Sequence, residues 1–167
     1  YKRQVTVLFG TILGTLVALL RLSRCKVFQA LTGAYIEVLR GTPILLQLYF
    51  FWLLLPKVLP FKVSDTACII VALVINSSSY VAEVIRAGIQ AVDKGQMEAA
   101  KSLGLSNKNA MRYVILPQAV KNILPALGNE FVVMVKETSL ASVFFVGELM
   151  TSYKTVQSTT FLAIPSL

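Results

Sequence analysis

The stretch TACIIVALVINSSSYVA, residues 66–82, carries no charged side chain, and residues 4–20 and 41–56 are also free of charge. A helix that spans a membrane needs about 20 mostly apolar residues. Lys and Arg side chains at the ends of such runs can reach toward water and lengthen the usable span. Three runs of this kind in 167 residues leave too little polar sequence to cover them in a soluble domain. The pattern therefore predicts an all-α fold, a polytopic transmembrane helical bundle.

A fourth, less regular span is predicted at residues 114–135, where Lys121, Pro125 and Glu130 interrupt an apolar run. Because lipid cannot satisfy these polar groups, this segment should face protein or water. Residues 138–147 are uncharged and predict a short or re-entrant piece. No further full-length span follows, so we expect about four spans, with a final span missing.

The composition excludes several classes of function. Hydrophobic residues make up 56% of the chain and charged residues 14%, whereas a soluble domain usually carries about 25% charged residues. There is no histidine, and both cysteines, Cys25 and Cys68, lie in or beside apolar runs. These counts exclude a Cys/His zinc site and argue against a disulfide framework. The net charge of +8 comes from basic residues between the apolar runs, which indicates membrane orientation and not a nucleic-acid partner.

Lys and Arg are concentrated in the connections that follow the first and third runs. Such connections favour the cytoplasmic side, so we predict an external N-terminus and a cytoplasmic loop at residues 86–121. Lys2 and Arg3 count against this orientation. The cytoplasmic set is Arg21, Arg24, Lys26, Arg40, Arg86, Lys94, Lys101, Lys108, Arg112 and Lys121, and the external set is Lys2, Arg3, Lys57 and Lys62.

The first run contains Gly10, Gly14 and Ala18, spaced four residues apart. Small residues at this spacing form a stripe along which another helix can approach closely. The stripe predicts a packing face, although the same spacing also arises by chance.

Residues 27–39 are amphipathic and are predicted to lie along or near the cytoplasmic interface. Arg40-Gly41-Thr42-Pro43 follows and should break the helix and restart it. Thr42 is suited to cap the new helix, and Pro43 is suited to its first turn.

The longest polar segment, DKGQMEAAKSLGLSNKNAMRYVILP, occupies residues 93–117. Asp93 and Gln96 have the spacing of a capping box, which begins a helix. Gly104 stands where a left-handed residue ends a helix, and Ser106 is a second N-cap candidate. The segment therefore predicts two short helices joined by a glycine bend, the second running to the proline at its end.

This predicted pair of helices has the features of a docking surface for another protein. Ala99 and Ala100 would present a small, flat surface that a partner can approach closely. A well-capped connector without a partner is the alternative interpretation. The remaining contacts would come from Met97, Leu103 and Leu105, flanked by Glu98 and Lys101.

The segment also resembles a known family. Glu98-Ala99-Ala100, then Gly104, then Ile115-Leu116-Pro117 is similar to the EAA loop of ABC-importer permeases. Four flanking stretches resemble the polar amino acid permeases within that superfamily, so the resemblance covers about residues 5–150. Ser78 departs from the pattern, because glycine is common there. The flanking stretches are Arg40-Gly41-Thr42-Pro43 with Gln47, Asn76-Ser77 with Tyr80, Ala82 and Glu83, Gly128-Asn129-Glu130-Phe131, and Lys136-Glu137-Thr138-Ser139-Leu140.

The resemblance implies a single transmembrane permease domain of the type I importer kind over residues 1–167, with a cytoplasmic coupling loop at about 86–117. It implies that the coupling helix sits in a cleft of a separate ATP-binding subunit. Glu98 would pair with a basic or donor group there, and Ala99 and Ala100 would permit close contact. Gly104 would set the bend, because side chains are penalised at positive φ.

The implied assembly has several components. It holds a second permease, identical or homologous, two ATP-binding subunits and an extracytoplasmic solute-binding protein, in a bacterial inner membrane. No G-x-x-x-x-G-K-[ST] motif occurs in the chain. We therefore expect a non-enzyme that binds no cofactor itself, with ATP and Mg²⁺ held by the partner subunit.

Polar groups inside the spans are the candidates for the substrate pathway, because such groups are functional by default. Asn76, Tyr80 and Glu83 follow one another at i, i+4 and i+7 and share one helical face. Glu130, Lys136, Glu137 and Thr138 cluster where the fourth span ends, and Glu137 could hold the cationic end of an amino acid. Interhelical hydrogen bonding and a local Lys136–Glu137 charge balance are the structural alternative.

Other functions stay open from the sequence. A permease of the same superfamily with another cargo, such as an opine, a sulfur amino acid or a small peptide, is one alternative. A membrane anchor that recruits a cytoplasmic partner is another, and it would show no uptake dependent on an ATPase and a binding protein. An ion channel would conduct without nucleotide and would need symmetric pore-lining rings, which the sequence does not display.

Overall fold

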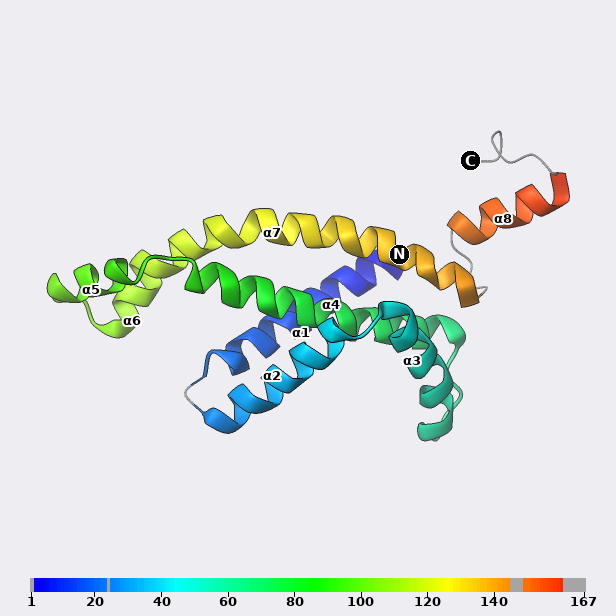
Figure 1. Cartoon of the computed structure of the whole chain (residues 1–167), viewed down its shortest axis with the longest axis horizontal. Helices are drawn as coiled ribbons and strands as arrows, with labels where there is room; N and C mark the ends of the chain where they lie inside the picture. Colours follow the sequence, from blue (N-terminus) through cyan, green and yellow to red (C-terminus); the bar gives the residue numbers. More distant parts are fainter. Residues whose placement is uncertain (1, 24, 145–148, 161–167) are drawn as a thin grey trace.

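The computed structural model describes residues 2–23, 25–144 and 149–160, and over these residues the chain is helical, with no strand. The helices form an elongated bundle in which α1, α2 and α7 pack along α4, with α5 and α6 at one end and α3 and α8 toward the other (Figure 1). The elements are α1 (Lys2–Arg21), α2 (Lys26–Gly41), α3 (Ile44–Val58), α4 (Asp65–Gln90), α5 (Lys94–Ser102), α6 (Asn107–Ala110), the π-helix η1 (Met111–Ile115), α7 (Leu116–Glu137), the 3-10 helix η2 (Thr138–Phe144) and α8 (Leu149–Thr160).

Helix α4 is the centre of the bundle, and it packs against α1, α2, α3 and α7. Its start is fixed by Ser64, whose hydroxyl accepts a hydrogen bond from the backbone N–H of Ala67 at 3.3 Å. Asp65 adds a negative charge to the first turn, where the helix dipole favours it. The buried residues of α4 are Cys68, Ile69, Ala72, Leu73, Asn76, Ser77, Ser78, Ser79, Val81, Ala82 and Gly88.

The small-residue stripe of α1 packs against α4, which confirms the predicted packing face. A Cβ added to Gly14 would lie 2.6 Å from Cβ of Val81 and 2.8 Å from the carbonyl oxygen of Ser78. A Cβ added to Gly10 would lie 2.6 Å from Oγ of Ser77. The two backbones are therefore closer than any side chain on the stripe would allow, and dispersion contacts between them are correspondingly dense.

Helices α2 and α3 are two limbs of a broken segment, bent by 109° at the Thr42-Pro43 junction. This corrects the prediction for the charge-free run 41–56, which is not an independent straight span, because α3 has only 15 residues. Residues 27–39 pack against α1 and α4 and bury Thr32, Gly33, Ile36 and Leu39. Their place near the cytoplasmic interface stays a prediction. Thr42 does not cap α3. Its hydroxyl donates to the carbonyl of Val38 in α2 at 2.8 Å.

Among the described residues, two helices are long and apolar enough to cross a membrane, Gln4–Arg21 and Asp65–Gln90, and the bent pair α2–α3 makes a third. The predicted fourth span lies in η1 and α7. Helix α7 has 22 residues, but Lys121, Glu130, Lys136 and Glu137 make its composition too polar to qualify. Such a helix needs neighbouring protein or water over its charged positions.

The segment that follows α7 is short, as predicted. Residues 138–144 form η2, and Ala141 and Phe144 complete a core with Leu48, Ile69 and Leu73. The end of the predicted segment 138–147 and residues 161–167 lie outside the described residues.

Close contact between α1 and α4 yields a stability prediction. Replacing Gly14 with Leu should destabilise the fold by about 1–3 kcal/mol, because the backbone of α4 leaves no room for the side chain. Unfolding of the purified protein in detergent measures this effect. Ala34→Leu, at an exposed position of α2, is the control and should change little; equal loss in both variants would contradict the packing role of Gly14.

Candidate functional site

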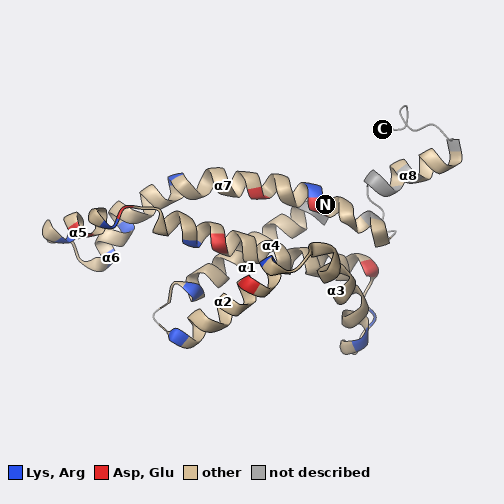
Figure 2. Ribbon diagram, in the orientation of Figure 1, with Lys and Arg blue, Asp and Glu red and all other residues tan. Residues whose placement is uncertain are grey.

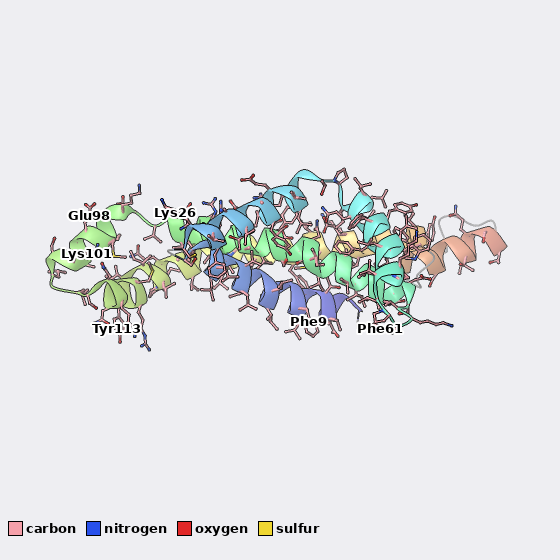
Figure 3. The ribbon with its side chains drawn as sticks, turned by 90° about the horizontal axis from the view of Figure 1, so that it is seen from below. Phe9, Lys26, Phe61, Glu98, Lys101 and Tyr113 are labelled. Carbon is pink, nitrogen blue, oxygen red and sulfur yellow. The ribbon has the colours of Figure 1, made fainter. Side chains whose placement is uncertain are left out.

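The predicted pair of short helices lies at one end of the long axis, beyond the bundle (Figure 1). Figure 3 shows the side chains of Glu98 and Lys101 pointing away from the rest of the molecule. Glu98 and Ala99 are exposed, and Leu103 is 84% exposed at the turn after α5. A projecting surface of small, charged and apolar residues is thus available to a partner. We call α5, α6 and their connection the terminal hairpin.

Schellman geometry ends α5, as the sequence predicted from Gly104. The backbone N–H of Leu105 donates to the carbonyl of Ala100 at 3.1 Å, and the N–H of Gly104 donates to the carbonyl of Lys101 at 2.9 Å. Gly104 has φ +85°, a value that L-residues with a Cβ rarely adopt. Ser106 then caps α6 through the N–H of Asn109 at 3.3 Å, which confirms the second predicted cap.

The start of α5 differs from the predicted capping box. The carboxylate of Asp93 accepts a hydrogen bond from the N–H of Gly95 at 2.6 Å. The side chain of Gln96 instead accepts one from Gln118 of α7 at 3.3 Å. A side chain predicted to close the cap therefore ties the hairpin to α7.

Only part of the predicted docking surface faces outward. Ala100 is 3% exposed, and Met97 packs against the small core of Val92, Ile115 and Ala119. Ala99 and Leu103 remain on the outer side. The two alanines consequently have different surroundings, because consecutive residues of a helix point about 100° apart. Ala100 is buried inside the structure, and Ala99 is exposed and accessible to a partner.

No loop separates α6 from α7. The five residues of η1 continue the helix directly into Leu116, and Pro117 falls in the first turn of α7. The prediction that the second helix ends at Pro117 is wrong, because the helix continues past the proline as α7. The π-helical turn η1 comes just before Pro117, which lacks the N–H that an interior α-helical turn would need.

Asn76 and Gln47 form the buried polar contact at the break between α2 and α3. The side-chain amide of Asn76 donates to Oε1 of Gln47 at 2.9 Å. Gln47 in turn donates to the carbonyl of Leu39 at 2.7 Å and to Oγ1 of Thr42 at 2.7 Å. The free carbonyl groups at the end of α2 are thus satisfied by a side chain of α3, which α4 holds in place.

The other two candidates on α4, Tyr80 and Glu83, lie in a cluster of charged side chains. Glu83 accepts two hydrogen bonds from Arg86, at 2.5 and 2.9 Å, and its carboxylate lies 3.7 Å from Arg40 of α2. The Arg40 guanidinium also lies 5.3 Å from the ring centroid of Tyr80. In this conformation Asn76 and Glu83 form hydrogen bonds within the chain, and the ring of Tyr80 contacts the Arg40 guanidinium.

The candidate residues on α7 and η2 lie toward the end of α7 that is remote from the hairpin. Glu130 is 7% and Thr138 3% exposed, and Glu137 is partly buried, whereas Lys136 is exposed. The hydroxyl of Thr138 donates to the carbonyl of Val135 at 2.8 Å. Glu130 and Glu137, seven residues apart, share one face of the helix. A cation at this face would meet two carboxylates.

Two polar contacts had no signal in the sequence beyond helical spacing. The hydroxyl of Tyr35 lies 2.6 Å from that of Ser78 and joins α2 to α4. Arg21 folds over Gly33 and donates to the carbonyl of Gln29. Among the described residues, no group of three or more Cys, Asp or Glu side chains is arranged to hold a metal ion.

The sequence of this chain is similar to those of known transport proteins. The family described as the binding-protein-dependent transport system inner membrane component matches residues 10–167. The arginine transport system permease protein ArtQ of Bacillus subtilis (strain 168) is 42% identical over 146 residues, which are 87% of this chain and 67% of that protein. A putative glutamine transport system permease protein, GlnP of Rickettsia bellii (strain RML369-C), is 38% identical over 157 residues, 94% of this chain and 72% of that protein.

Solved structures agree with the sequence comparisons. A crystal structure of an amino acid ABC transporter with histidines superposes with a TM-score of 0.90 and 45% identity, covering 99% of this chain and 77% of that chain. The MetNI methionine ABC transporter in an inward-facing conformation has a TM-score of 0.74 at 19% identity and covers 93% and 74%, which shows a common fold. The helical bundle is therefore the fold of ABC-importer permeases. The chain belongs to the family of binding-protein-dependent transport system inner membrane components.

The contact between Gln47 and Asn76 can be measured by a double-mutant cycle. Replacing each with Ala, singly and together, should show a coupling of about 0.5–1.5 kcal/mol, because Asn76→Ala removes the donor to Oε1 of Gln47 and Gln47→Ala removes the acceptor for the Asn76 amide. Unfolding in detergent gives the free energies. A second cycle between Gln47 and Thr15 of α1, whose hydroxyl bonds only within its own helix, should be additive. Additivity in both cycles would show that the hydrogen bond between Gln47 and Asn76 does not stabilise the fold.

Proposed function

We propose that this chain is the permease subunit of an ATP-driven ABC importer for polar amino acids, and that the terminal hairpin couples it to a separate ATP-binding subunit. The observation that carries the proposal is the hairpin itself. It projects from one end of a bundle of permease fold, and its exposed surface includes Glu98, Ala99 and Leu103. The family membership supports the same function.

Polar amino acids are the cargo that the relatives support, since their names refer to arginine and glutamine transport. The candidate substrate pathway consists of Asn76, Tyr80 and Glu83 on α4 and of Lys136, Glu137 and Thr138 after it. The partly buried carboxylate of Glu137 is suited to an ammonium or guanidinium group. Since Asn76 and Glu83 already bond within the chain, their contact with a substrate would require those bonds to be exchanged.

The assembly that we propose contains a second permease, two ATP-binding subunits that hold ATP and Mg²⁺, and an extracytoplasmic solute-binding protein. The permease would lie in the bacterial inner membrane with its N-terminus outside and the hairpin in the cytoplasm. It would catalyse no reaction itself. Closure of the ATP-binding subunits would displace the two hairpins and shift the membrane helices between inward- and outward-facing states.

The hairpin proposal predicts different outcomes for its two alanines. Ala99→Arg places a large charged side chain on the outer surface and should lower ATP-driven uptake by about tenfold or more in the reconstituted transporter, without preventing membrane insertion. Gly104→Pro should likewise uncouple ATP hydrolysis from uptake. Ala100→Arg should instead destabilise the hairpin, because Ala100 is buried within the chain.

Ala91→Arg provides the control for this comparison, because it adds the same side chain at an exposed position just after α4. Its uptake should be close to that of the unmodified transporter. Normal transport by the Ala99→Arg and Gly104→Pro complexes would show that the hairpin does not couple the subunits. Uptake without dependence on an ATPase or a binding protein would favour a different function altogether.

The substrate pathway is tested at Glu137. Glu137→Ala should lower uptake of cationic amino acids by about tenfold, and uptake of neutral ones by less, because the charge-assisted bond to the cationic side chain is lost. Radiolabelled arginine and glutamine uptake by the reconstituted transporter gives both values. Lys62→Ala, at an exposed charged position before α4, is the control. Unchanged uptake of both amino acids would remove Glu137 from the pathway.

A further inference from the structure

A cleft of about 490 Å³ opens between α1, α2 and α4, and it includes Glu83 of the candidate substrate pathway. Figure 2 shows basic and acidic positions near one another on these three helices. The lining includes three guanidinium groups, from Arg21, Arg40 and Arg86, and two carboxylates. The full lining is Arg21, Gly33, Ile36, Glu37, Arg40, Gly41, Glu83 and Arg86.

The charges of the cleft do not cancel. Arg86 and Glu83 neutralise one another through two hydrogen bonds. Arg40 lies 3.7 Å from the same carboxylate, and its side chain is 42% exposed, so it retains donors for another partner. Arg21 bonds to a neutral backbone carbonyl. Glu37 is exposed at the rim. Two guanidinium groups therefore face the cleft against one exposed carboxylate.

Gly33 determines where the Arg21 side chain lies. A Cβ at this position would lie 2.9 Å from Cζ of Arg21, so the absence of a side chain lets the guanidinium lie across α2. Arg21 thereby reaches the cleft from α1, and Arg40 reaches it from α2. A forked, planar pair of donors on two helices suits an oxyanion with several acceptor oxygens, such as a phosphate.

The cleft lies close to the same end of both candidate spans. Arg21 is the last residue of one candidate span, and Arg86 lies four residues before the end of the other, Gln90. Exposed apolar side chains continue from this end along both helices. These are Leu16, Leu19, Leu20 and Leu22 from α1 and its end, and Val27, Phe28 and Leu31 from α2. A molecule with an anionic head and apolar chains fits both surfaces at once.

We propose that this cleft binds the phosphate group of an anionic phospholipid from the leaflet on the hairpin side. The phosphate lies between Arg21 and Arg40, and the acyl chains follow the apolar surface of α1 and α2. Basic pockets between transmembrane helices are the known physical means of selecting anionic headgroups over zwitterionic ones. The bound lipid adds to the direct contact between α1 and α2, in which Val17 and Ala18 pack against Ile36.

The experiment measures lipids that remain bound to the whole transporter. The complex is reconstituted in nanodiscs with equal parts of phosphatidylglycerol and phosphatidylcholine, and native mass spectrometry gives the ratio of the two lipids retained after release. Arg21→Gln and Arg40→Gln should each lower the enrichment of phosphatidylglycerol by about fivefold. Gly33→Leu keeps every charge but displaces Arg21, and it should lower the enrichment as well.

Two controls separate the possible sources of the phosphate. Lys57→Gln removes a positive charge at an exposed position of α3 and should leave the enrichment unchanged. A second sample receives millimolar inorganic phosphate, which should displace phosphatidylglycerol if the cleft recognises the phosphate alone, and should not if the acyl chains contribute. Enrichment that is equal in the Arg21, Arg40 and Lys57 variants, or absent in the unmodified complex, would overturn the assignment.

Discussion

The side chain of Gln47 satisfies the open end of a helix inside an apolar bundle, and the arrangement of α2, α3 and α4 depends on it. The break at Thr42-Pro43 leaves carbonyl groups without intrahelical hydrogen-bond donors. In a hydrocarbon layer no water is available to donate hydrogen bonds to them. Gln47 donates to two of these oxygens, at Leu39 and Thr42, and is oriented by Asn76. Without such a side chain, a bend of 109° in this setting would leave several strong acceptors unpaired.

Close approach of α1 to α4 depends on a different feature, the absence of side chains at Gly10 and Gly14. Lipid chains are as apolar as leucine, so burial alone does not drive two membrane helices together. Dense contact between backbones replaces that driving force, and it is possible only along a stripe of small residues. The polar residues Asn76 to Ser79 of α4 contact α1, α2, α3 and α7.

The glycine bend and the second N-cap of the hairpin could be predicted from the sequence, because both depend on neighbouring residues in the chain. Gly104 and Ser106 act through their own backbone and their immediate neighbours, so their spacing is sufficient to place them. The helix stripe on α1 was visible for the same reason. Predictions failed where distant neighbours decide the outcome. Gln96 bonds to Gln118 of another helix, Ala100 is buried, and the run 41–56 forms only the short helix α3 after a sharp bend, because contacts between helices decide these outcomes.

The unbroken connection from α6 through η1 into α7 has a mechanical consequence. Helix α7 has 22 residues and is therefore about 33 Å long, with the hairpin at one end and Glu130 and Glu137 in its other half. If a helix of this length tilts as one unit despite the interior Pro125, a tilt of about 10° at the hairpin displaces the opposite end by about 6 Å. That distance exceeds the reach of a hydrogen bond. A small tilt of α7 at the hairpin is thus enough to form or break polar contacts at the opposite end of the helix.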